Sequence, residues 1–227
     1  MNSFASPQTL AALPFSLAAD DLYSQVFEAI LEQRIHAGSR FTEESLAQMF
    51  GARRSDVRAV LTQLSHQQII VLRVNHRPRI AELCTEQTRQ TLHARRLAQI
   101  MLVRLACQHP CAQALQGLHD LVRRERQCTR RGQAIRLSAE FHLQLAQMAG
   151  NAPLAHFLGS LIPLTSLAIA QIDANTQDCC DWQANLEILH ALERGDSAKA
   201  VEALNRHLDH LEDRLLNPEP IQHRVAG

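Results

Sequence analysis

The chain of 227 residues is long enough for one large or two modest domains with a substantial buried core. Its 23 basic and 23 acidic residues give a formal net charge of zero, so any attraction to nucleic acid must be local rather than global. Leucine and alanine are abundant, whereas glycine, proline and aromatic residues are scarce, which favours helix over sheet.

Cysteine usage and hydropathy indicate the compartment. The six cysteines form no CxxC pair and no secretory leader precedes them, so we expect reduced thiols in a cytoplasmic protein. No apolar run approaches the ~20 residues of a membrane helix, so no membrane partner is expected.

The first fifty residues predict an arm and two helices. Residues 1–19 carry no charge that would define a helix face, and we expect a flexible arm. From Asp20 an apolar stripe predicts a helix that continues through Ile35. A short helix is then expected after Thr42, which is a suitable N-cap with Glu44 or Ser45 close behind.

The stretch GARRSDVRAVLTQLSHQ, residues 51–67, predicts a second helix after a glycine turn. Apolar residues at 3–4 spacing give it one buried face, and Arg53, Arg54 and Arg58 lie on the opposite face. Two short helices joined by a tight turn, with arginines at the start of the second, are typical of a helix-turn-helix. An ordinary pair of surface helices is the alternative that the spacing alone leaves open.

A basic hairpin is predicted next. Residues 69–74 and 79–83 are rich in β-branched side chains, and Asn75, His76 and Arg77 lie between them. Three helices followed by this hairpin make a winged helix-turn-helix over residues 20–83. Between Gly51 and Ile80 six arginines stand against one acid, Asp56, so the local basic excess falls on this domain.

The rest of the chain predicts a helical bundle. Apolar residues at 3–4 spacing predict six helices, with Gly, Pro or Asn at most of the breaks between them. The expected helices are residues 91–108, 112–130, 133–148, 153–172, 182–194 and 197–216. The predicted fold class is therefore mostly α, with an N-terminal winged helix-turn-helix followed by an all-α antiparallel bundle over residues 87–216 and a frayed tail at 217–227.

The first domain resembles the DNA-binding domain of the GntR family of bacterial transcription regulators, whose core pattern LA…G…R…VR…L recurs in LAQMFGARRSDVRAVLTQL. In that family the arginine of the turn and the arginine of VR reach phosphates and guanines, which implies these roles for Arg54 and Arg58. The sequence departs from the pattern where the family has serine, proline and a wing-tip glycine, because Arg53, Asp56 and Arg77 stand there. The residues implied to contact DNA are Thr42, Arg53, Arg54, Ser55, Arg58, Asn75, His76 and Arg77.

The second domain resembles the FCD effector-binding domain that accompanies many GntR regulators. The matching phrases are RRLAQ, EFHLQLA followed by AGN, and ILHALERGD followed by HL. Such domains commonly hold zinc or nickel through an Asp, the His four residues later, and two further histidines. The resemblance places two of these ligands on His142 and His207, but Ser138 and Asn185 occupy the other two positions.

The resemblance therefore implies a reduced site. It either binds a divalent metal weakly through His142 and His207 or binds an effector directly. The residues implied to contact the effector are Arg95, Ser138, His142, Asn185 and His207. Histidines that hydrogen-bond to their neighbours within the bundle are the alternative, and Glu140 is turned away from His142 by the helical period. Other histidines, His210 among them, are interpreted as surface or spacer residues.

The expected function is a transcription regulator, usually a repressor, that binds a double-stranded DNA operator as a homodimer. A small metabolite bound in the bundle, which we expect to be an organic acid, would modulate the binding of the operator. Two alternatives remain open at this point: a constitutive DNA-binding protein whose sensor pocket has decayed, and a metal-dependent enzyme, against which the missing carboxylate ligands and the absence of a nucleophile–base pair argue.

Overall fold

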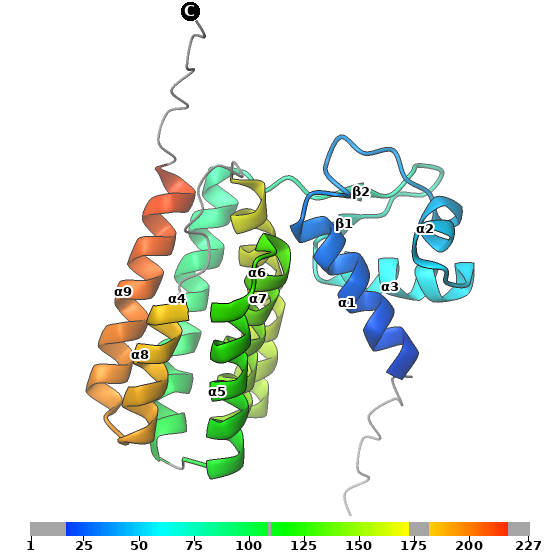
Figure 1. Ribbon diagram of the computed structural model, residues 1–227. Coiled ribbons are helices and arrows are strands. Elements are labelled where there is room, and N and C mark those ends of the chain that lie inside the picture. Colours follow the sequence, from blue (N-terminus) through cyan, green and yellow to red (C-terminus); the bar gives the residue numbers. More distant parts are fainter. Residues whose placement is uncertain (1–16, 109, 173–181, 218–227) are drawn as a thin grey trace, which may run out of the picture.

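The computed structural model describes residues 17–108, 110–172 and 182–217, and of residues 17–20 the backbone only. In these residues a small N-terminal domain lies beside a helical bundle (Figure 1). The predicted fold class is confirmed. The described residues do not include residues 1–16 of the predicted arm, two of the six cysteines (Cys179 and Cys180) or residues 218–227 of the predicted tail. Residues 17–19 of the arm belong to the first helix.

From residue 17 onwards, the N-terminal domain consists of three helices and a two-stranded sheet. These elements are α1 (Leu17–Leu31), α2 (Glu43–Phe50), α3 (Arg54–His66), β1 (Ile70–Val71) and β2 (Arg79–Ile80). Helix α1 ends four residues before the predicted limit at Ile35, and Gln33 there has a positive φ of 57°. The turn between α2 and α3 lies on the side of the domain remote from the bundle (Figure 1).

Local sequence explains the helix-turn-helix. Thr42 caps α2, because its side chain accepts from Ser45 N while the Ser45 side chain accepts from Thr42 N, a reciprocal capping box. Gly51 ends α2 in the left-handed conformation at φ 61°, which glycine adopts without steric cost. The apolar face of α3 is fully buried and consists of Val57, Val60, Leu61 and Leu64.

The strands of the wing, which is the basic hairpin over residues 69–83, are shorter than predicted. Only two residues pair on each strand, Ile70 with Ile80 and Val71 with Arg79. Ile70 and Ile80 are buried, whereas the residues between Val71 and Arg79 are mostly exposed. A strand without a buried face has little to stabilise it, so the intervening residues form an open loop.

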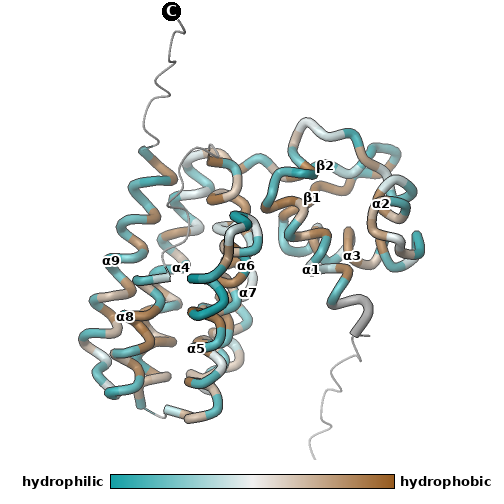
Figure 2. The backbone as a smooth tube through the Cα atoms, viewed as in Figure 1, coloured by the Kyte–Doolittle hydropathy of each residue, from teal (hydrophilic) through white to brown (hydrophobic). Residues whose placement is uncertain are grey.

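Six helices form the bundle within the described residues from Thr85 to Asn217, as predicted. They are α4 (Thr85–Gln108), α5 (Ala112–Gln127), α6 (Arg131–Met148), α7 (Ala152–Gln171), α8 (Trp182–Glu193) and α9 (Ser197–Leu216). Figure 2 shows hydrophobic and hydrophilic stretches alternating along these helices, as amphipathic packing requires. The main difference is that α4 begins six residues earlier than expected, where Glu86 accepts hydrogen bonds from Arg89 and Gln90 along the exposed first turns.

Helix α7 is the most apolar element. By length and composition alone it would suffice to cross a membrane, with a mean hydropathy of 1.5, so the expectation that no segment is long and apolar enough was wrong. In the structure α7 packs against α4 and α6, and Thr165 and Ser166 interrupt its apolar character. The core helix of a bundle passes the same composition test, and we interpret α7 as such a helix.

One of the hydrophobic clusters extends across both domains. Ile135 of α6 and Leu164, Leu167 and Ala170 of α7 belong to the same buried cluster as the core of the N-terminal domain. Helix α1 packs on both α6 and α7. The orientation of the N-terminal domain is therefore fixed by side-chain packing as well as by the connecting segment after β2.

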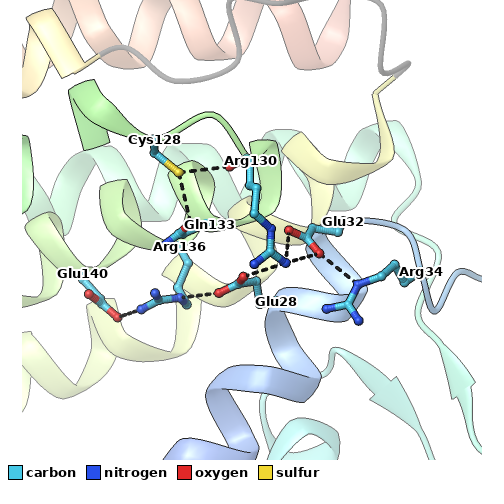
Figure 3. A network of polar contacts seen from close by, with 8 residues as sticks. All are labelled: Glu28, Glu32, Arg34, Cys128, Arg130, Gln133, Arg136 and Glu140. Carbon is cyan, nitrogen blue, oxygen red and sulfur yellow. Dashed lines mark hydrogen bonds and ion pairs between the residues drawn. The ribbon is translucent and has the colours of Figure 1, made fainter. Parts of the chain in front are cut away.

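Ion pairs lie along one side of the joint between the two domains, where α1 packs on α6 (Figure 3). Arg130 contacts Glu32 at 2.6 Å and Glu28 at 3.1 Å, and Arg136 contacts Glu28 at 3.2 Å and also pairs with Glu140. Burial alone would raise the pKa of Glu32, but hydrogen bonds from Arg130 and Arg34 lower it overall. Several linked charges of alternating sign hold α1 against the start of α6.

Gly132 allows the close approach of α6 to α1. A Cβ at this position would lie 2.4 Å from Glu32 Cγ, 2.9 Å from the Glu32 backbone nitrogen and 3.1 Å from the Glu28 carbonyl oxygen. The backbone contacts are shorter than a Cβ tolerates, so only glycine fits without displacement of one helix. A change in the position of α6 therefore acts directly on α1.

Candidate functional site

The start of α3 presents three exposed arginines, and each of them has an acidic partner. Arg58 forms a bidentate pair with Glu43, from Nε to Oε1 at 2.8 Å and from Nη2 to Oε2 at 2.7 Å. Arg54 contacts Glu44 at 3.3 Å and Glu43 at 3.8 Å. The Arg58 hydrogen bond lowers the pKa of Glu43 and raises that of Arg58, so both stay charged at neutral pH.

Arg53 pairs with Asp56 across the first turn of α3. Its Nε donates to Oδ2 at 2.8 Å and its Nη2 donates to Oδ1 at 3.3 Å. Two departures from the family pattern, the arginine and the aspartate, thus meet in one ion pair. Ser55 is exposed and lies 3.3 Å from Asp56, whereas the hydroxyl of Thr42 is engaged in the α2 cap.

The wing adds a basic groove with a volume of about 480 Å³. Its lining includes His76 and Arg77, which the sequence implied as DNA contacts, and Asn75 lies at the exposed wing tip with φ 59°. The groove is also lined by Arg40, Arg73 and Arg79. The sequence counts Arg73 and Arg79 among the local arginines, but the residues before α2 give no signal that Arg40 folds back to this groove.

A small cavity lies in the bundle, mainly between α4, α6, α7 and α9. Its volume is about 30 Å³, which is room for roughly one water molecule. Four of the five residues implied for effector binding line it: Arg95, Ser138, His142 and His207. The fifth, Asn185 of α8, is fully buried and donates from Nδ2 to Ser138 Oγ at 3.0 Å.

Arg95 is a buried cation with neutral partners. It is 4% exposed, and it donates from Nε to Gln99 Oε1 and from Nη1 to Thr165 Oγ1, both at 2.8 Å. Among the described residues its hydrogen-bond acceptors are these two neutral groups, and no carboxylate forms an ion pair with it. Burial lowers the pKa of Arg95 to about 9, so at neutral pH an uncompensated positive charge lies at the cavity.

Two buried imidazoles face this charge. The rings of His142 and His207 lie 5.2 Å apart between centroids, and the side chains are 1% and 9% exposed. Within the described part of the chain, neither ring nitrogen of His142 and not Nδ1 of His207 has a hydrogen-bond partner. The predicted alternative of histidines hydrogen-bonded to their neighbours therefore fails for these three atoms.

Both imidazoles are neutral at physiological pH. Burial is the largest cause that lowers the pKa of His142 well below its ordinary value, and repulsion by Arg95 and by His207, when His207 is protonated, acts in the same direction. Burial, Arg95 and His210 lower the pKa of His207 to about 3. Each neutral ring offers one N–H donor and one acceptor nitrogen to whatever enters the cavity.

The donor set does not suit a tightly bound transition metal. Ser138 and Asn185 are hydrogen-bonded to each other, and Asn185 Nδ2 also donates to Glu125 Oε2 at 2.9 Å. Residues 17–108, 110–172 and 182–217 contain no group of three or more His, Cys, Asp or Glu side chains that could hold a metal. Two imidazoles without a third strong ligand fall short of the three or four that zinc sites use.

The sequence did not single out the residues that hold Arg95 or those that complete the cavity lining. Gln99 lies one turn after Arg95, and Thr165 and Ser166 are adjacent hydroxyls in an otherwise apolar helix, a pattern that could have indicated a polar lining. His210 is exposed, as expected, yet it also lines the cavity. Glu140 pairs with Arg136 at the domain joint rather than turning towards His142, as expected.

A winged helix-turn-helix with exposed arginines, joined to a bundle with a charged cavity, defines a DNA-binding protein with a helical accessory domain. Comparison with known proteins agrees with this assignment to a class of DNA-binding proteins. Residues 18–79 match the family of bacterial regulatory proteins named gntR, and residues 90–210 match the FCD domain. The chain belongs to the gntR family of transcription regulators, in the group with an FCD domain.

Two solved structures of low sequence identity share the fold. E. coli McbR/YncC has a TM-score of 0.72 and 14% identity, over 88% of this chain and 98% of its own. A protein described as a putative transcriptional regulator GntR from Rhodococcus sp. RHA1 has a TM-score of 0.72 and 16% identity, over 90% of this chain and 100% of its own. No curated protein sequence matches the chain.

Proposed function

We propose that this regulator is a repressor in the bacterial cytoplasm, and that a small organic acid bound in the bundle cavity controls its affinity for a DNA operator. The observation that carries the effector proposal is the uncompensated charge of Arg95 beside two imidazoles with unpaired ring nitrogens. A buried cation without a counter-ion is energetically costly, and a carboxylate would both neutralise it and accept from an imidazole N–H.

The size of the cavity sets how such a ligand would act. About 30 Å³ admits no molecule of several carbons, so an organic acid must displace the side chains or helices around it. Ile135 lines the cavity and also belongs to the core shared with α1. Movement of α6 would therefore reach the N-terminal domain through the Gly132 contact and the ion pairs of the joint.

We further propose that the protein is a homodimer that pairs through the face formed by α4 and α7. Leu97 and Met101 of α4 and Phe157 of α7 are large apolar side chains that are about half exposed. Only 44% of the most apolar window of α7 is buried within one chain. A second copy would cover this surface, and two winged domains would then address the two halves of a palindromic operator.

A screen of small carboxylic acids tests the effector proposal. A thermal-shift assay finds compounds that stabilise the native protein, and fluorescence anisotropy then measures whether they release a labelled operator. At a hundredfold excess over its dissociation constant, a ligand of the folded state adds about 2.7 kcal/mol to the free energy of unfolding. Arg95→Gln should abolish this response.

Arg96→Gln is the matched control, because Arg96 pairs with Asp209 and Glu212 rather than with groups of the cavity. An Arg95→Gln protein that responds as the native one does would contradict the assignment.

A constitutive DNA-binding protein is the second candidate, and the small cavity favours it. In that case no carboxylate would stabilise the protein or change its affinity for the operator. We propose no catalytic activity, since the two serine hydroxyls that line the cavity, Ser138 and Ser166, are hydrogen-bonded to Asn185 and to the Ile162 carbonyl rather than to an imidazole. We also propose that the cavity works without a tightly bound zinc or nickel ion.

A further inference from the structure

Glu43 contacts Arg58 in a way that leaves part of the guanidinium free. A guanidinium carries five N–H donors in one plane, one on Nε and two on each Nη nitrogen. Glu43 accepts from Nε at 2.8 Å and from Nη2 at 2.7 Å, so it occupies the inner edge of the guanidinium, which is the edge nearest the side-chain stem. The outer edge, which consists of Nη1 and the second N–H of Nη2, remains available for a bidentate contact.

The outer edge of Arg58 suits a guanine. Guanine presents its O6 and N7 acceptors side by side in the major groove, and two parallel N–H donors match that spacing. Arg58 lies in the first turns of α3, the end of a recognition helix that meets base edges, and its side chain is 66% exposed. Holding the inner edge removes rotamer freedom that Arg58 would otherwise lose on binding DNA.

Arg54 differs from Arg58 in this respect. Its outer nitrogens face carboxylates, Nη1 at 3.3 Å from Glu44 and Nη2 at 3.8 Å from Glu43. These contacts must break before its outer edge can approach DNA. A phosphate contact, which needs no fixed edge, suits Arg54 better than base recognition.

We propose that Glu43 is a positioning residue for DNA recognition, which holds Arg58 by its inner edge so that the outer edge reads a guanine of the operator. This inference rests on the proposed operator binding. Glu43 is itself held in place, because it is the first residue of α2 and the capping box of Thr42 and Ser45 fixes that helix start. The ion pair is exposed in the free protein, and the exclusion of water by DNA strengthens it.

The charge of Glu43 also contributes to selectivity. A carboxylate close to the DNA backbone opposes binding at every sequence, whereas the guanine contact offsets this repulsion only at the right sequence. Removal of the charge should therefore weaken discrimination without weakening non-specific binding. A purely structural ion pair between α2 and α3 would instead change only the thermal stability.

The test begins with an operator selected from random duplexes by the native protein. The guanine contacted by Arg58 is the position at which Arg58→Ala no longer distinguishes guanine from adenine. We expect the native protein to prefer guanine there by about tenfold or more, and Glu43→Gln to prefer it by about threefold or less. Affinity of Glu43→Gln for a non-specific duplex should equal or exceed the native value, because one negative charge is gone.

Glu44→Gln is the matched control, since it removes the same charge from the same turn but touches only Arg54. It should keep the native preference, and a melting curve of each variant separates loss of fold from loss of recognition. The inference is overturned if Glu43→Gln keeps the native preference for guanine, or if Glu44→Gln loses it equally. If the native protein selects no sequence at all, the proposed operator binding fails instead.

Discussion

The two buried imidazoles make a quantitative prediction about acid stability. His142 and His207 stay neutral in the folded protein, because the pKa of His142 lies well below its ordinary value and the pKa of His207 is about 3. In the unfolded chain each imidazole takes up a proton below about pH 6.5. The unfolded state therefore binds more protons in this range, and the free energy of unfolding falls as the pH falls.

The expected loss follows from that linkage. Below about pH 6.5 each neutral imidazole lowers the free energy of unfolding by about 1.4 kcal/mol per pH unit. For His207, whose pKa is about 3, this amounts to about 2 kcal/mol between about pH 7.5 and pH 5, and His142 adds a loss in the same direction. Contributions from carboxylates outside the cavity are common to a native protein and a histidine variant, so they cancel in the difference.

Urea unfolding followed by circular dichroism measures this difference, with protein first dialysed against a chelator. The double variant His142→Gln with His207→Gln should lose at least about 2 kcal/mol less stability than the native protein between about pH 7.5 and pH 5. If native protein and variant show the same pH dependence, the imidazoles accept protons inside the cavity and the reasoning is wrong.

Three further predictions concern the cavity, the dimer face and the domain joint. Elemental analysis should find little transition metal in the dialysed native protein and more in Ser138→Asp with Asn185→His; about one metal ion per native chain would contradict the donor argument. In light scattering at micromolar protein, Met101→Glu should convert a dimer to a monomer, whereas a native monomer would refute the dimer. Gly132→Ala should lower the free energy of unfolding by about 1–3 kcal/mol through overpacking. Gly159→Ala is the control, because its new Cβ would meet no atom within 4 Å, and it should raise the free energy of unfolding by about 0.5–1 kcal/mol. Equal effects of the two substitutions would contradict the close approach of α6 to α1.

The features that the sequence predicted are those set by neighbouring residues. Thr42 and Ser45 form a cap within one turn, and Gly51 ends the helix next to it, so the helix-turn-helix follows from local chemistry. The bundle helices show their apolar period directly. The start of α4 was missed because its first turns are polar and depend on contacts of Glu86 with neighbours three and four residues away, which carry no apolar signal.

Contacts between distant residues could not be predicted in the same way. The resemblance to a known family brought His142 and His207 together, but it gave no sign that Thr165 of α7 holds Arg95. The pairing of Glu43 with Arg58 depends on how α2 crosses α3. Packing of whole helices decides such contacts, and periodicity records only which face of a helix is buried.

Binding of the operator by the start of α3 can be tested directly. Fluorescence anisotropy with a selected operator should show that Arg54→Ala combined with Arg58→Ala weakens binding at least about 30-fold, equivalent to about 2 kcal/mol. Arg89→Ala with Arg123→Ala is the control, because these exposed arginines pair with Glu86 and Asp120 on the bundle and should leave the affinity unchanged. Native affinity in the α3 variant would show that this helix is not the DNA-binding element.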